Sequence, residues 1–195
     1  SKVPKVVDTI EIEEAMHAGA EGFGNHVLRG YIDPRSHLHI DDARTYFSAG
    51  QKRYDVIISE PSNPWVSGVS SLFTRQFYRF LTQHLEKDGV LIQWMQTYEL
   101  NEPLFYTMVA ALIEECPYVD AYVTNTSDVV FVASHVPIPD FDASQLQDPG
   151  LLADLKRQGL ETGADHQVRR FANRDVLTGL VELFGAPVHT DFYPT

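Results

Sequence analysis

Apolar and polar positions change their spacing several times along the chain, and the most informative change lies in residues 54–78. This stretch reads YDVIISEPSNPWVSGVSSLFTRQFY. Its apolar run at 56–58 is short and rich in β-branched residues, which indicates a buried strand. Glu60 ends the strand, a Pro-Ser-Asn-Pro turn follows, and apolar residues at helical spacing come next. Open α/β sheets place reactive groups at such strand ends, so we expect chemistry here.

The remaining pattern alternates strands with helices and then ends in a strand pair. Strands are predicted at residues 5–13, 37–42, 90–95, 118–124 and 129–134, and helices at 13–20, 43–49, 101–115, 151–158 and 176–184. The glycines between 19 and 24 follow a helix, so they predict a helix stop and a turn, not a phosphate loop. Together these elements predict an α/β fold with a mostly parallel sheet, helices on both faces and an antiparallel edge.

Composition narrows the class of protein. A chain of 195 residues with 44% hydrophobic and 22% charged residues is a single folded domain. The net charge of −12 argues against a nucleic-acid partner, because phosphates would be repelled. Cys116 is the only cysteine, which excludes an internal disulfide and suits a reducing compartment, so we expect a cytoplasmic protein.

Carboxylates end three successive predicted strands, namely Glu11, the pair Asp41-Asp42, and Glu60. The carboxyl ends of parallel strands meet at the same edge of a sheet, so these side chains form a candidate site. Acids in such positions can hold ribose hydroxyls, accept a hydrogen bond from an exocyclic amine, or deprotonate an amine nucleophile.

Five ordered motifs resemble those of a known family: TIEIE, DPRSHLHIDDAR, YDVIISEPSNPW with LFTRQFY, DGVLIQW, and HTDFYPT. They are similar to the motifs of the spermidine synthases, the polyamine aminopropyltransferases, and most of all to a diverged branch often fused to membrane helices. The resemblance implies a Rossmann-like fold of the S-adenosylmethionine methyltransferase type. It also implies transfer of an aminopropyl group from decarboxylated S-adenosylmethionine to a polyamine such as putrescine, with release of methylthioadenosine.

The resemblance assigns roles to individual residues. Glu11 matches the acid that holds the nucleoside ribose, and Asp42, beside Ala43, matches the acid that contacts the adenine amine. Glu60 falls where the family has the aspartate that activates the attacking amine. Asn63 falls on a second aspartate of that motif.

Departures from the family pattern concern the amine substrate. Glu60 is one methylene longer than aspartate, and Asn63 has no charge to pair with an ammonium. Gln93 and Trp94 straddle the position of an amine-contacting glutamine. Trp65, after the Asn-Pro turn, is an aromatic candidate for stacking on a planar amine, or simply fills the turn.

The resemblance also implies a central first strand and a glycine-rich loop upstream of residue 5. Without them the strands at 5–13 and 55–60 would lack a shared neighbour, and their backbone groups would lose partners. We therefore expect the chain to be an N-terminally truncated single domain, part of a longer protein and inactive by itself.

Other functions stay open at this point. An S-adenosylmethionine-dependent N-methyltransferase would use the same fold, and a non-catalytic module binding a nucleoside or a polyamine would explain the replaced aspartate.

His37 and His39 share a strand face, but no further ligand completes a metal site, so we expect no metal. The expected partners are a polyamine substrate and a second copy in a homodimer, with a membrane only through segments outside this chain.

Overall fold

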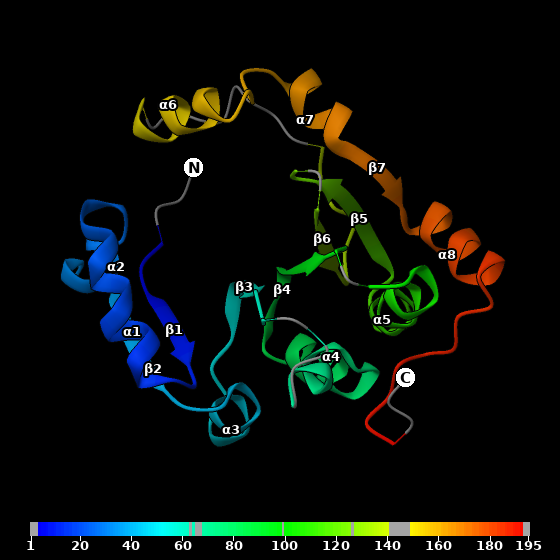
Figure 1. The fold of residues 1–195 in the computed structure, drawn as a ribbon, viewed down its shortest axis with the longest axis horizontal. Coiled ribbons are helices and arrows are strands. Elements are labelled where there is room, and N and C mark those ends of the chain that lie inside the picture. Colours follow the sequence, from blue (N-terminus) through cyan, green and yellow to red (C-terminus); the bar gives the residue numbers. More distant parts are fainter. Residues whose placement is uncertain are drawn as a thin grey trace. The chain divides into compact units, whose positions relative to one another are not determined.

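The chain forms two compact units, Ser1–Lys52 and Arg53–Thr195, called here the first and the second unit (Figure 1). The computed structural model describes residues 4–62, 64, 68–98, 100–125, 127–140 and 149–192, with the backbone alone for His26 and Arg29.

The first unit contains a two-stranded parallel sheet, formed by β1 (Val7–Glu11) and β2 (Ser36–Ile40). The strands are in register, so that Val7 pairs with Ser36 and Glu11 with Ile40, and both run in the same direction. The helices of this unit are α1 (Glu14–Ala20), the 3₁₀ helix η1 (Glu21–His26), α2 (Leu28–Ile32) and α3 (Ala43–Ala49). The predicted strands and helices of this unit are confirmed.

The glycine-rich stretch of the first unit differs from the expected turn. It forms η1, and the only bend within that helix falls at Gly24, whose φ of 57° lies in the left-handed region. A residue with a Cβ adopts this φ at a cost, which explains a glycine at this position. The stretch follows α1 directly and does not connect a strand to a helix, as the sequence indicated.

The second unit is built on a five-stranded sheet with the order β3-β4-β6-β5-β7. Its strands are β3 (Tyr54–Ser59), β4 (Leu85–Gln96), β5 (Tyr118–Val123), β6 (Asp128–Ser134) and β7 (Arg170–Asn173). β3 and β4 are parallel, whereas β6 runs antiparallel to both β4 and β5, and β7 antiparallel to β5. The parallel pairing of the described strands is thus confined to the first four, and the predicted antiparallel pair is confirmed.

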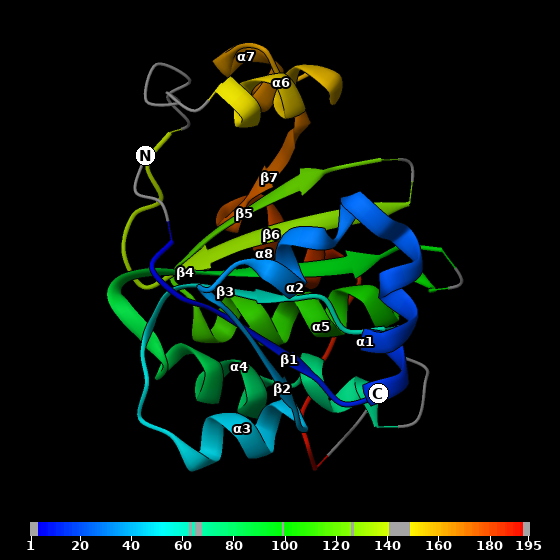
Figure 2. The ribbon, with the colours of Figure 1, turned by 90° about the vertical axis from the view of Figure 1, so that its left-hand side faces the viewer.

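Helices α4 (Arg75–Thr82), α5 (Glu102–Glu115) and α8 (Arg174–Leu183) pack in a row against one face of this sheet (Figure 1), and α4 and α5 are seen along the strands in Figure 2. Their inward residues form the core, with Leu81, Val109, Leu112 and Leu177 no more than 1% exposed. Asn101 begins α5 as predicted, because its side-chain oxygen accepts a hydrogen bond from the Leu104 amide at 2.8 Å. The 3₁₀ helix η2 (Val69–Phe73), α6 (Pro149–Arg157) and α7 (Gly163–Arg169) complete the unit.

Strand β3 is less buried than its sequence indicated. Ile57 is 7% exposed, but Val56 and Ile58 on the opposite face are 47% and 67% exposed. β3 also lies at the edge of the sheet and pairs with β4 alone among the described strands. The expectation of a strand buried on both faces is therefore wrong for these described residues.

Candidate functional site

In the first unit, the structure brings Glu11 and Asp42 to the same end of the two-stranded sheet. Glu11 ends β1, its ladder partner Ile40 ends β2, and the Asp41 amide donates to the Glu11 carbonyl at 3.0 Å. Asp42 follows at once and begins α3, because its carboxylate accepts from the Thr45 amide at 3.0 Å. The two carboxylates therefore lie at adjacent carboxyl ends of parallel strands, as the sequence predicted.

Local hydrogen bonds fix the backbone around these two acids. The Glu11 carboxylate accepts from the Glu13 amide at 2.9 Å, and the Asp41 carboxylate accepts from the Asp42 amide at 2.8 Å. Ala43 is the first residue of α3, next to the cap. Short side chains that bond to nearby amides hold the turn in one conformation, so the edge of the sheet is preorganised.

In the second unit, Glu60 follows the last residue of β3 and is exposed to solvent. Its neighbour Ser59 pairs in register with Gln93 of β4. Glu60, Gln93 and Trp94 consequently lie at the carboxyl end of one parallel strand pair. This is the arrangement in which open α/β sheets bind ligands.

Gln93 and Trp94 point to opposite faces of the sheet and differ in exposure. The Gln93 side chain is fully buried, and its amide nitrogen donates to the Ser59 carbonyl at 3.2 Å and to the Trp94 carbonyl at 2.8 Å. Trp94 is partly exposed. Of these two amine-substrate candidates, therefore, only Trp94 is accessible to solvent. Gln93 instead holds the end of β3, after which Glu60 follows, through its hydrogen bond to Ser59.

Two further candidates, Asn63 and Trp65, lie outside the described residues. Pro64 between them is described and lies in a turn, as expected of the Pro-Ser-Asn-Pro sequence. Among the described residues, no group of three or more His, Cys, Asp or Glu side chains could hold a metal ion.

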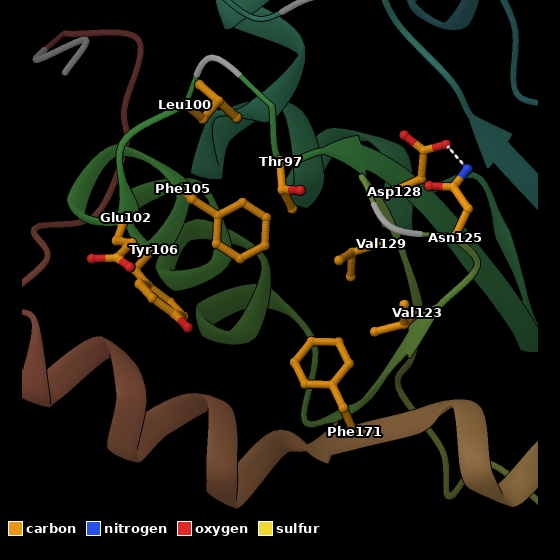
Figure 3. A pocket seen from close by; sticks show the side chains of 10 residues that line it. All are labelled: Thr97, Leu100, Glu102, Phe105, Tyr106, Val123, Asn125, Asp128, Val129 and Phe171. Atoms are coloured by element: carbon orange, nitrogen blue, oxygen red, sulfur yellow. Dashed lines mark hydrogen bonds between the residues drawn. The ribbon is translucent and has the colours of Figure 1, made fainter.

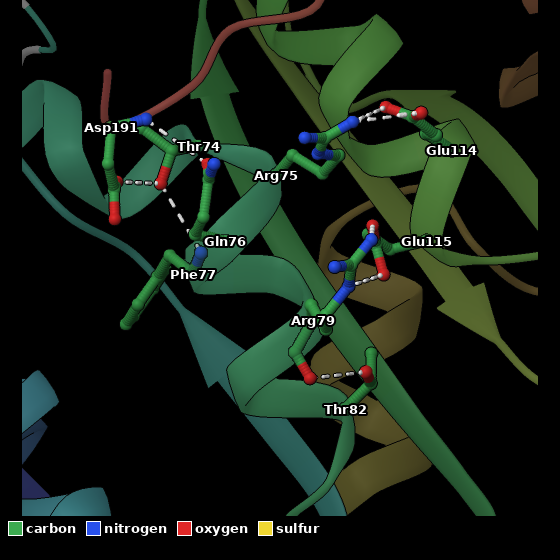
Figure 4. Close-up of polar contacts among 9 residues, drawn as sticks. All are labelled: Thr74, Arg75, Gln76, Phe77, Arg79, Thr82, Glu114, Glu115 and Asp191. Atoms are coloured by element: carbon green, nitrogen blue, oxygen red, sulfur yellow. Dashed lines mark hydrogen bonds and ion pairs between the residues drawn. The ribbon is translucent and has the colours of Figure 1, made fainter.

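The C-terminal segment of the described chain binds the start of α4, a role that sequence reasoning missed. The Thr74 hydroxyl donates to the Asp191 carboxylate at 2.6 Å, and the Asp191 amide donates to the Gln76 side chain at 3.1 Å (Figure 4). Thr74 also caps α4 by accepting from the Phe77 amide. The HTDFYPT motif therefore includes a residue, Asp191, that is hydrogen-bonded to the start of α4, the helix that follows the Glu60 turn.

His189, in the same C-terminal segment, is buried and makes further hydrogen bonds to the core of the second unit. Its backbone carbonyl accepts from the Arg75 amide at 2.9 Å, and its backbone amide donates to the Thr107 carbonyl at 3.2 Å. Its side chain is 1% exposed, and Nε2 lies 3.0 Å from the Ser70 carbonyl oxygen. A carbonyl can only accept, so Nε2 carries the hydrogen and donates. His189 thus joins η2, α4 and α5.

The family is identified by the match of residues 2–130 to the spermine/spermidine synthase domain. The chain belongs to this family. Curated polyamine aminopropyltransferases are similar to part of this chain. A polyamine aminopropyltransferase of Buchnera aphidicola is 34% identical over 70 residues, which cover 36% of this chain and 24% of that protein.

Solved structures agree with the family assignment at the level of the fold. A spermidine synthase in complex with the transition-state analogue AdoDATO matches with a TM-score of 0.71 and 17% identity, over 92% of this chain and 62% of that one. Human methyltransferase-like protein 13, solved in complex with SAH, matches with a TM-score of 0.54 and 19% identity, over 80% of this chain and 69% of that one. The Rossmann-like methyltransferase-type fold is thereby confirmed. The chain spans about a quarter of the curated relative's length and about 60% of the synthase structure.

No helix within the described ranges is long and apolar enough to cross a membrane.

The buried imidazole of His189 is expected to make the free energy of unfolding of this protein depend on pH. Burial lowers the pKa of the imidazole, opposed by its bond to the Ser70 carbonyl and by the Asp191 carboxylate. A lowered pKa means that the unfolded chain binds the proton more readily, so the free energy of unfolding falls as the pH drops below about 6.5. In urea titrations at a series of pH values, His189→Gln should flatten this fall.

The exposed His37 supplies the matched control for that experiment. His37→Gln should leave the pH dependence of the urea midpoint as it is in the unchanged protein. An equally steep fall in His189→Gln would show that the buried imidazole does not cause it.

Proposed function

We propose that the protein transfers an aminopropyl group from decarboxylated S-adenosylmethionine to a polyamine such as putrescine. The observation that carries the proposal is the placement of carboxylates at the carboxyl ends of two parallel strand pairs, Glu11 with Asp42 and, in the second unit, Glu60. Membership in the spermine/spermidine synthase family supports it. So does the likeness in fold to a synthase that binds AdoDATO.

Glu60 is proposed as the general base. The acceptor amine must lose a proton so that the lone pair of its nitrogen can form the new C–N bond with the aminopropyl carbon. The C–S bond breaks, its electron pair stays on sulfur, and methylthioadenosine leaves. The Glu60 carboxylate takes the amine proton, and its exposed position at a strand end leaves it accessible to the acceptor.

Glu11 and Asp42 are proposed to bind the adenosine of the donor. A carboxylate accepts hydrogen bonds from two vicinal ribose hydroxyls, and charged acceptors bind more strongly than neutral ones. Asp42, beside Ala43 at the start of α3, is suited to accept from the adenine amine. Neither role needs a metal ion.

Gln93 is proposed to position Glu60 and not to touch substrate. Its amide holds the carbonyl of Ser59, the residue before Glu60. For Asn63 and Trp65 the proposed roles are those that an Asn-Pro turn with an aromatic residue after it suggests, an amide near the reacting nitrogen and a ring beside the amine.

Product analysis tests the proposal directly. The full-length protein is incubated with putrescine and either decarboxylated S-adenosylmethionine or S-adenosylmethionine, and the products are identified by mass spectrometry. We expect spermidine and methylthioadenosine from the decarboxylated donor and no methylated amine from the other. The reverse pattern would support the second candidate, an N-methyltransferase, which is favoured by the likeness in fold to a methyltransferase in complex with SAH.

A non-catalytic binding module is the third reading, because a glutamate stands where the family has its catalytic aspartate. It predicts binding of methylthioadenosine or of a polyamine without any product from either donor. Calorimetry beside the product analysis therefore separates it from both enzymes.

The nucleoside role predicts the effect of Glu11→Ala. Loss of hydrogen bonds to a charged acceptor should weaken methylthioadenosine binding by about 1.5–3 kcal/mol, measured by calorimetry on the full-length protein. Glu14→Ala, which removes an exposed carboxylate from the first turn of α1, is the matched control and should bind as the unchanged protein does. Equal affinity of Glu11→Ala and the control would remove Glu11 from the nucleoside site.

The expected homodimer and the cytoplasmic location stay predictions. Light scattering on the full-length protein tests the first, and fractionation of cells that express it tests the second.

A further inference from the structure

The C-terminal segment, residues 189–191, is hydrogen-bonded to η2 and to the start of α4. Side chains as well as backbone take part, since the His189 imidazole and the Asp191 carboxylate each make one of these bonds. The Asp191 carboxylate points at the residue between the two helices (Figure 4). The partners of the C-terminal segment in this region are Ser70, Thr74, Arg75 and Gln76.

η2 is a short helix that needs partners from outside itself. It is a 3₁₀ helix of five residues, and Gly68, which precedes it, has no side chain that could cap it. The hydrogen bonds of 3₁₀ helices have poorer geometry than those of α-helices. Phe73, 1% exposed, packs the last residue of η2 into the core. The bond from His189 to the Ser70 carbonyl therefore holds the part of η2 that lies nearer to Glu60 in the chain.

Residues 60–68 connect β3 to η2 and carry the proposed base at their start. One end of this connection is fixed, because Ser59 pairs in the sheet with β4. Pro61 and Pro64 lie within it, and each proline ring fixes the φ angle of its residue. A connection with few free dihedral angles passes a shift at one end on to the other. The position of Glu60 therefore depends on where η2 is held.

We propose that the C-terminal segment is a positioning element for the reaction. It holds η2, and through residues 60–68 it holds the Glu60 carboxylate within reach of the acceptor amine. His189 and Asp191 act only through this connection and touch neither substrate. The inference rests on the proposed function for the role of Glu60. The hold on η2 itself needs no substrate.

Two variants of His189 test the inference in the full-length protein. His189→Phe keeps a ring but loses the donor to the Ser70 carbonyl, whereas the amide of His189→Gln can still donate there. With decarboxylated S-adenosylmethionine and putrescine, we expect kcat to fall about tenfold in His189→Phe, because a misplacement of roughly 1 Å can cost up to about 100-fold. In His189→Gln the retained bond should limit the fall to about threefold. The KM for the donor should stay within about twofold, since only the transition state is affected.

Asp191 offers a second pair of variants with less risk to folding, because its side chain is exposed. Asp191→Ala removes the acceptor of the Thr74 hydroxyl, and Asp191→Asn keeps an oxygen in its place. We expect kcat to fall about threefold in Asp191→Ala, less than in His189→Phe because Thr74 lies farther along the chain from Glu60. Asp191→Asn should transfer as the unchanged protein does.

Phe171→Ala is the matched control for a loss of stability alone. Phe171 belongs to β7, at the opposite edge of the sheet from β3, and its ring lines a pocket of about 330 Å³ beside Phe105 and Val129 (Figure 3). Loss of this ring should lower the melting temperature of the second unit and leave kcat unchanged. If lost stability explained the effect of the His189 and Asp191 variants, kcat would fall in this variant as well.

Hydrogen exchange measures the hold on η2 without any substrate. In His189→Phe, the amides of η2 should exchange about tenfold faster than in the unchanged protein, because loss of a fixing bond makes local opening easier. In Phe171→Ala and in His189→Gln the same amides should nearly keep their rates.

The outcomes distinguish this inference from the proposed function. Transfer by the unchanged protein, with the same kcat in His189→Phe and Asp191→Ala, would overturn the inference and leave the function standing. An equal fall of kcat in His189→Phe and His189→Gln would also overturn it, because the bond to Ser70 would then not matter. If the unchanged protein gives no product from either donor, the function is overturned. The exchange of the η2 amides then decides alone whether the C-terminal segment holds η2, and unchanged rates in His189→Phe would show that it does not.

Discussion

Replacing Glu60 with glutamine is expected to lower the rate of aminopropyl transfer by at least about 100-fold, the usual contribution of a general base. Glutamine keeps the size and one acceptor oxygen of glutamate, but it cannot take the proton that the acceptor amine loses. Binding of methylthioadenosine should stay nearly intact, because only the transition state uses the proton affinity of this residue. Mass spectrometry of product against time measures the first quantity, and calorimetry the second.

Two further variants sharpen the test of Glu60. Asp55→Asn removes another exposed carboxylate from the same strand and should leave transfer unchanged. Glu60→Asp restores the residue that the family has, with a carboxylate displaced by roughly 1 Å, and a change on that scale can alter rates about 100-fold. Undiminished product from Glu60→Gln would assign the base to another residue.

The strands and helices of the first half could be predicted because local patterns decide them. The β-branched run at 56–58 and the cap at Asp42 are signals within a few residues, and the structure has β3 and α3 where they indicate. Strand β7 was not predicted. Its sequence, RFAN, has four residues and no alternation, and it is a strand only because it pairs with β5, about fifty residues earlier.

The residues of the candidate site also fall into those that a local sequence pattern predicts and those that it does not. Glu11 and Glu60 could be found because each ends a β-rich run before a turn. The bond from Thr74 to Asp191 joins residues 117 positions apart, and no local pattern indicates that these two side chains meet. The buried position of Gln93 was not evident either, because burial of β4 depends on distant elements such as α4 packing against it.

A further strand that pairs with β3 is expected to stabilise the second unit considerably. Within the described residues β1 pairs only with β2, and β3 only with β4. Each is therefore an edge strand among the described strands, and an edge strand can take up a further strand. We propose that the full-length protein supplies a strand upstream of residue 5 that pairs with β3, and a glycine-rich loop that binds the donor.

The energetic reason lies in the exposed apolar surface and not in buried unpaired backbone groups. Val56 and Ile58 of β3 are 47% and 67% exposed. A neighbouring strand would cover part of each side chain, and complete burial would contribute at most about 1.5–3 kcal/mol for each. Against a total stability of about 5–15 kcal/mol, this is a large share.

A comparison of this 195-residue chain with the full-length protein measures the effect. We expect the melting temperature of the second unit to be roughly 5–10 °C higher in the full-length protein, since about 1 kcal/mol shifts a protein of this size by 2–4 °C. Amide groups of β3 that point away from β4 should exchange hydrogen quickly in the 195-residue chain and at least about 100-fold more slowly in the full-length protein. Methylthioadenosine should bind the 195-residue chain more weakly, because the proposed loop is absent from it.

Amides within β4, which has a partner on both sides, are the internal control and should show the smaller change. Equal exchange at β3 in both proteins, together with equal melting and equal affinity, would show that the free edge of β3 is its native state and that no strand is added there.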